Sequence, residues 1–170
     1  MTEQTIQNRV ASSGLITIDL ASYFPQGNEI TSWDMKPYLF MGLIVKEADY
    51  RAALQQVDWS EFQNKHVAII CSADAIIPHW AWMLAATYLQ PIAQSIYFGD
   101  ADTMKTTLLL QHIDGLDTTD YTDKRIVIKG CGSIPVPASA YMAITAKLLP
   151  VAKSIMYGEP CSTVPVFKKK

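Results

Sequence analysis

The chain has 170 residues with a formal net charge of -2, and 49% of its residues are hydrophobic and 18% are charged. This composition excludes a disordered chain and predicts one globular domain over residues 1–170. The slight acidic balance excludes the basic surface of a nucleic-acid-binding protein, and we interpret the final KKK as a solvated tail. No apolar run approaches the roughly 18 residues that span a bilayer, so no membrane contact is expected.

The first predicted segment is the polar stretch at residues 1–14, MTEQTIQNRVASSG, which we expect to be flexible. It lacks the apolar core of a secretory signal, and this predicts a cytoplasmic protein. The chain carries 3 cysteines. An odd, sparse count in a reducing compartment favours reduced thiols over a disulfide framework.

Local composition predicts secondary structure in four segments of the chain. LITIDLASYF (15–24) predicts a strand, whereas WDMKPYLFMGLIV (33–45) is apolar and fits either a helix or a strand. Helical segments are expected at about 47–56 and about 102–113.

The most specific signal is an internal repeat. AWMLAATYLQPIAQSIYFGD (81–100) and AYMAITAKLLPVAKSIMYGE (140–159) share 8 of 20 positions at an offset of 59 residues. Unrelated segments of ordinary composition would share about one position. We therefore predict two tandem related units of about 59 residues, at about 42–100 and 101–160.

Each repeat predicts the same order of elements. A buried strand, VAII (67–70) or IVI (126–128), leads into a cysteine loop and then a proline, where a helix of about 11 residues begins. A second strand, SIYFG or SIMYG, closes the repeat. This alternation predicts an α/β fold with a mostly parallel or mixed sheet covered by helices.

The cysteines lie where such a fold binds ligands. Cys71 and Cys131 each follow a predicted strand, and ligands bind beyond the carboxyl ends of strands in open α/β sheets. Cys161 follows the last strand of the second repeat. If the repeats are related by an approximate two-fold axis, their cysteine loops could approach one another.

Three interpretations of the cysteines stay open. In the first, they bind a metal, zinc or iron, and the residues considered as ligands are Cys71, Cys131, Cys161, His79, Asp74 and Glu159. In the second, the protein is an enzyme that uses Cys131, between two glycines and near Lys129, as a nucleophile or persulfide carrier. In the third, the cysteines are inert and the protein is a structural module that binds a partner.

The motifs also carry a resemblance. CSADAIIPHWAWML, IVIKGCGSIPVPASAY and AKSIMYGEPCSTVP are together similar to domain-of-unknown-function family 2480, a bacterial family without an assigned activity. The resemblance covers roughly residues 13–168 and implies a setting near iron–sulfur cluster assembly. We therefore expect a thiol- or metal-binding accessory protein. Its expected partners are iron–sulfur assembly proteins and, because of its apolar Trp and Met side chains, a second copy in a homodimer.

Overall fold

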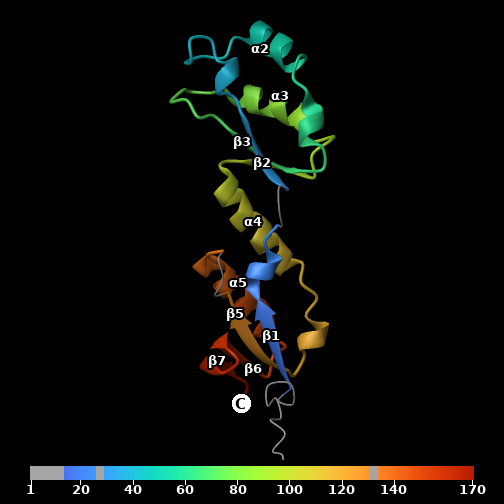
Figure 1. Cartoon of the computed structure of the whole chain (residues 1–170), viewed down its shortest axis with the longest axis vertical. Coiled ribbons are helices and arrows are strands. Elements are labelled where there is room, and N and C mark those ends of the chain that lie inside the picture. The colour runs from blue at the N-terminus through green and yellow to red at the C-terminus, as the bar shows by residue number, and fades with distance from the viewer. Residues whose placement is uncertain (1–13, 26–28, 131–133) are drawn as a thin grey trace, which may run out of the picture. The chain divides into compact units, whose positions relative to one another are not determined.

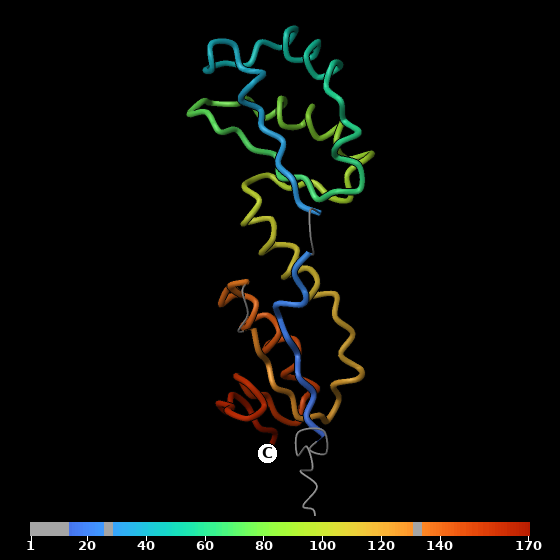
Figure 2. Tube along the Cα trace, viewed as in Figure 1, coloured from blue at the N-terminus to red at the C-terminus, as the bar shows by residue number. Residues whose placement is uncertain are grey.

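The structure is a computed structural model that describes residues 14–25, 29–130 and 134–170. These residues form two compact units, and the chain passes from one to the other and back (Figures 1 and 2). Unit 1 combines Met1–Phe24 with Thr106–Lys170, and unit 2 is the continuous segment Pro25–Lys105. Each unit has a sheet and a hydrophobic core of its own.

Unit 2 contains three parallel strands in the order β2-β3-β4. Its elements are β2 (Ile30–Asp34), α2 (Glu47–Leu54), β3 (His66–Ile70), α3 (His79–Leu89) and β4 (Ser95–Phe98). Central strand β3 reads HVAII, and its first four residues are buried, as expected for a strand covered on both faces. α3 begins after Pro78 and buries Ala81, Ala85 and Leu89, which lie on one helical face.

Unit 1 contains four strands in the order β1-β5-β6-β7, of which only β7 runs antiparallel to its neighbour. Its elements are β1 (Leu15–Asp19), α4 (Ala101–Asp114, which starts within unit 2), β5 (Arg125–Lys129), α5 (Ala138–Leu148), β6 (Ser154–Glu159) and β7 (Ser162–Lys168). α5 begins after Pro137 and buries Ala140, Ile144 and Leu148 against β5 and β6.

The α/β class is confirmed, with the strands divided between two sheets. The first residues of β3 and β5, His66 and Arg125, are 59 positions apart, as are those of α3 and α5 and those of β4 and β6. A common origin of the two repeats, and a single domain over the whole chain, stay predictions.

The ambiguous segment 33–45 forms neither a long helix nor a long strand. β2 ends at Asp34, a short 3-10 helix covers Lys36–Tyr38, and a turn follows that is closed by a bridge between Phe40 and Ile44. Over the three described ranges, no helix has the length and apolar character needed to cross a membrane.

Candidate functional site

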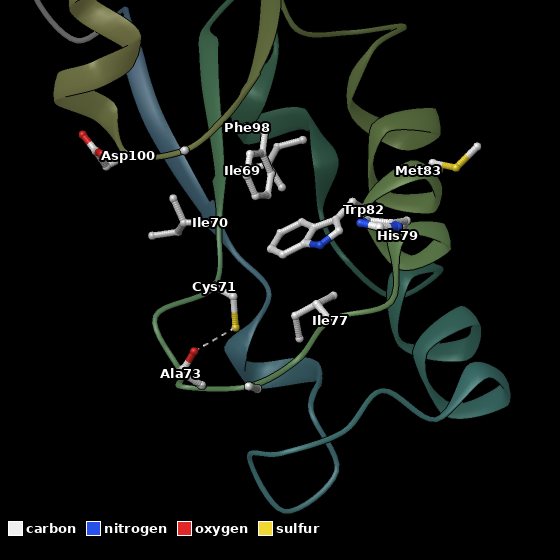
Figure 3. A pocket seen from close by; sticks show the side chains of 12 residues that line it. Ile69, Ile70, Cys71, Ala73, Ile77, His79, Trp82, Met83, Phe98 and Asp100 are labelled. Atoms are coloured by element: carbon white, nitrogen blue, oxygen red, sulfur yellow. Dashed lines mark hydrogen bonds between the residues drawn. The ribbon is translucent and has the colours of Figure 1, made fainter.

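A pocket with a volume of about 970 Å³ lies in unit 2, at the carboxyl ends of β3 and β4. Residues from the end of β3, the loop that follows it, the first turn of α3 and the end of β4 line it; they are Ile69, Ile70, Cys71, Ala73, Ala75, Ile77, His79, Trp82, Met83, Phe98, Gly99 and Asp100 (Figure 3). This is the position at which open parallel sheets bind ligands.

An aromatic pair forms the apolar centre of the pocket. Figure 3 shows the Trp82 ring with Ile69 and Phe98 on one side and Cys71 and Ile77 on the other. Trp82 and Phe98 meet edge to face, with ring centroids 5.1 Å apart and an interplanar angle of 86°. α3 is apolar on several faces, so the helix that buries Ala81 in the core also presents Trp82 to the pocket.

Three polar groups lie at the margin of this apolar centre. Cys71 is half-buried, and its Sγ lies 3.7 Å from the carbonyl oxygen of Ala73. His79 is exposed at the first position of α3. Asp100 caps α4, since its carboxylate accepts hydrogen bonds from the Thr103 amide and hydroxyl, and these bonds hold the Asp100 pKa below its usual value.

The loop that carries Cys71 is attached to the neighbouring strand by Asp34. The Asp34 carboxylate accepts hydrogen bonds from the Ser72 amide (3.0 Å), the Ser72 hydroxyl (2.5 Å) and the Lys36 amide (2.9 Å). Partial burial raises the pKa of Asp34, but the hydrogen bonds from Ser72 and Lys36 outweigh it and the net shift is downward. Asp34 thus fixes the residue directly after the thiol.

The structure brings together two of the predicted site residues. Cys71 and His79 line the same pocket, whereas Asp74 is exposed in the intervening loop and does not line it. In unit 1, Cys161 is exposed in the turn between β6 and β7. Glu159 forms an ion pair with Lys129, with Oε2 and Nζ 3.8 Å apart. Cys131 lies outside the described residues.

A metal centre does not emerge from this arrangement. In the part of the chain that the structure describes, no group of three or more His, Cys, Asp and Glu side chains is placed to hold a metal ion. Lys129 also forms an ion pair with Asp19 at 3.4 Å, so the carboxylate of Glu159 lies beside a cation. A site made by all three cysteines remains a prediction from the sequence.

Sequence reasoning missed several residues that shape the pocket. Trp82 lies one position after buried Ala81 on a helix that is apolar on several faces, so the sequence pattern does not separate a pocket side chain from a core side chain there. The pattern SIYFG predicts a strand at Phe98 but not that the Phe98 side chain is 70% exposed. Asp34 had one usable signal, because an Asp at a strand end often caps the turn that follows.

Fold and pocket together define an α/β protein with a ligand-sized pocket beyond the ends of parallel strands. The chain belongs to the family described as protein of unknown function (DUF2480), whose model matches residues 4–169, and this confirms the resemblance noted in the motifs. No curated protein and no solved structure matches the chain.

Proposed function

We propose that unit 2 is a binding module for a small molecule with an apolar body, and that the Cys71 thiol meets the polar or electrophilic end of that molecule. The observation that carries this proposal is the pocket of about 970 Å³ at the ends of β3 and β4. Pockets of this size bury most of a small ligand and combine apolar walls with a few polar groups.

The side chains support a division of roles within the pocket. The Trp82 and Phe98 rings supply an apolar surface on which a flat ligand can pack. Cys71 is half-buried beside this surface, so a molecule bound on the rings reaches the thiol. His79 also lines the pocket, and its ring nitrogens can donate a hydrogen bond to, or accept one from, a bound molecule.

Competitive labelling tests this proposal, with Cys161 as the internal control because it is an exposed thiol outside the pocket. A chain with Cys131→Ser is treated with limiting N-phenylmaleimide or with iodoacetamide, and labelled peptides are quantified by mass spectrometry. We expect the ratio of Cys71 to Cys161 labelling to be several-fold higher with the aromatic reagent. Trp82→Ala should abolish this difference. Equal ratios for the two reagents in the unaltered pocket would refute the proposal.

Zinc or iron binding is the second candidate, and the observation that favours it is the shared pocket of Cys71 and His79. Elemental analysis of protein purified without oxygen and without a metal-affinity tag tests it. Near-stoichiometric metal that is lost in the chain with Cys71→Ser, Cys131→Ser and Cys161→Ser supports it, and metal-free native protein excludes it. A link to iron–sulfur cluster assembly and an enzymatic role of Cys131 stay predictions from the sequence.

A further inference from the structure

β4 is the edge strand of the unit 2 sheet. Among the strands of the described residues, β4 pairs with β3 alone. The Gly99 amide donates a hydrogen bond to the Ile69 carbonyl of β3. The direction of the backbone amide and carbonyl alternates from residue to residue along a strand. The amide and carbonyl of Tyr97 therefore also point to β3, whereas those of Ile96 and Phe98 point to the outer edge. Ile96 and Phe98 therefore present a row of donors and acceptors.

The equivalent edge in unit 1 is covered. β6 starts 59 positions after β4, and β7 runs antiparallel along its outer side. Ile155, which corresponds to Ile96, lies opposite Phe167. Tyr157, which corresponds to Phe98, lies opposite Val164. Each pair joins an aromatic to a β-branched side chain, a combination that stabilises antiparallel strands.

We infer that β4 pairs antiparallel with β4 of a second copy of the chain, about a two-fold axis that passes beside Tyr97. In this register Ile96 lies opposite Phe98 of the partner subunit, Phe98 lies opposite the partner's Ile96, and the two Tyr97 residues face each other. Two copies of β4 thus form the same kind of aromatic and β-branched pairs that β6 and β7 form in unit 1, and no third segment is needed.

The side chains around the edge fit such a partner. Phe98 is 70% exposed and Met83 of α3 is 68% exposed, and both line apolar surface next to the unpaired backbone groups of β4. These two residues, with Ile96 and Tyr97, line an apolar groove of about 250 Å³. β4 has the sequence SIYF and carries no charge, so no like charges oppose each other across the two-fold axis.

Oligomeric state is the first test. Size-exclusion chromatography with light scattering over a dilution series should give a species of twice the 18.9 kDa chain mass. Phe98→Pro removes an outward amide as well as the ring, and it should raise the dimer dissociation constant by at least about tenfold relative to Phe98→Thr, which keeps the amide. A monomeric native protein, or a Phe98→Pro variant that dimerises as well as Phe98→Thr, overturns the inference.

A cross-link tests the register and does not depend on the proline variant. The two Tyr97 Cα atoms would be about 4.5 Å apart, within the range that a disulfide bridges. Tyr97→Cys, in a chain whose native cysteines are serine, should form a disulfide-linked dimer on a non-reducing gel. Gln94→Cys is the matched control, since its two copies would be far apart, and it should stay monomeric on that gel. A cross-link at position 94 and none at position 97 overturns the inference.

Discussion

At the scale of single residues, the geometry of the candidate site depends on Asp34. Among the described residues, Asp34 is the only β2 residue whose side chain forms hydrogen bonds with Ser72, and these bonds hold the Cys71 loop against β2. Asp34 lies at the end of its strand and does not line the pocket itself. We therefore treat it as a positioning residue.

The first prediction concerns loss of this carboxylate. Asp34→Ala should increase the rate of Cys71 alkylation several-fold, because the loop loses two hydrogen bonds through Ser72. The free energy of unfolding should fall by no more than about 1 kcal/mol, since these bonds are near solvent. Asp58→Ala is the control, because Asp58 binds the amide and hydroxyl of Ser60 in the same manner away from the pocket. An equal increase in both variants would contradict the assignment.

The second prediction is a pH dependence at the same residue. The pKa of Asp34 lies below its ordinary value of 3.8, so the ionised carboxylate stabilises the fold at pH values above 3.8. That contribution is lost as the pH falls through the lower pKa of the folded state. Urea unfolding should show native protein more stable than Asp34→Asn at neutral pH, and the difference should shrink below about pH 4. A difference that stays constant down to pH 3 would contradict it.

The sequence predicted where Cys71 lies in the fold, but it did not predict the contact that holds the Cys71 loop in place. Cys71 after a strand and His79 at a helix start follow from local pattern, and both line the pocket. The contact of Asp34 with Ser72 joins residues 38 positions apart. It depends on the register of β2 against β3, which no local pattern in one sequence supplies.

At the scale of elements, two glycines at equivalent positions of the repeats, 59 residues apart, have different surroundings. Gly99 after β4 and Gly158 within β6 both have positive φ, of 130° and 119°. A Cβ on Gly158 would lie 2.5 Å from the carbonyl oxygen of Ser162 in β7, whereas one on Gly99 would meet the Tyr97 ring at 2.9 Å. The Ser162 carbonyl is held in a paired strand, so an added Cβ displaces it less easily than it displaces the Tyr97 side chain.

The third prediction compares these two positions. Gly99→Ala should cost about 1 to 3 kcal/mol of unfolding free energy, mainly through backbone strain, because the Tyr97 ring is a side chain that can shift away from the new Cβ. Gly158→Ala carries the same strain together with the clash in the β6–β7 hairpin, so its cost should be clearly larger. Chemical denaturation followed by far-UV circular dichroism measures both. Equal costs would show that β7 moves aside freely.

The sequence predicted the helices that begin after a proline and carry a clear apolar pattern. It did not predict the strand β7, which depends on its pairing with β6. α3 and α5 have 11 residues each and begin directly after Pro78 and Pro137, as the sequence indicates. No strand was predicted at β7, and Pro165 within it is a residue type that argues against a strand. In the structure Pro165 lies opposite Met156 beside a register shift on an edge strand, where a residue without an amide hydrogen is tolerated.

At the scale of the whole molecule, two hydrophobic cores divide the chain. One surrounds Leu148 in unit 1 and the other surrounds Leu89 in unit 2, and both leucines are fully buried. The 4 tryptophans, at positions 33, 59, 80 and 82, all belong to unit 2. Tryptophan fluorescence therefore reports on unit 2, and far-UV circular dichroism reports on both units.

The fourth prediction uses this distribution. Leu89→Ala should lower the unfolding midpoint seen by fluorescence, with a cost of about 2 to 5 kcal/mol. Leu148→Ala, the equivalent change 59 positions later, should destabilise unit 1 to a similar extent. Because each leucine packs in its own core, we expect Leu148→Ala to shift the circular dichroism transition and leave the fluorescence transition in place. If both probes shift together in both variants, the chain unfolds as the single domain that its length predicts.

The pairing of β1 with β5 has a consequence for synthesis of the protein. Leu15 lies opposite Arg125, so the partner of the first strand is translated long after it, at roughly 5 to 20 residues per second. Unit 2 is continuous in sequence and is made entirely within that interval. Its folding on the ribosome would shorten the effective loop between β1 and β5 and lower the entropy cost of closing it. Until then, the nascent chain carries β1 as an unpaired apolar strand, the stage at which chaperones would bind it.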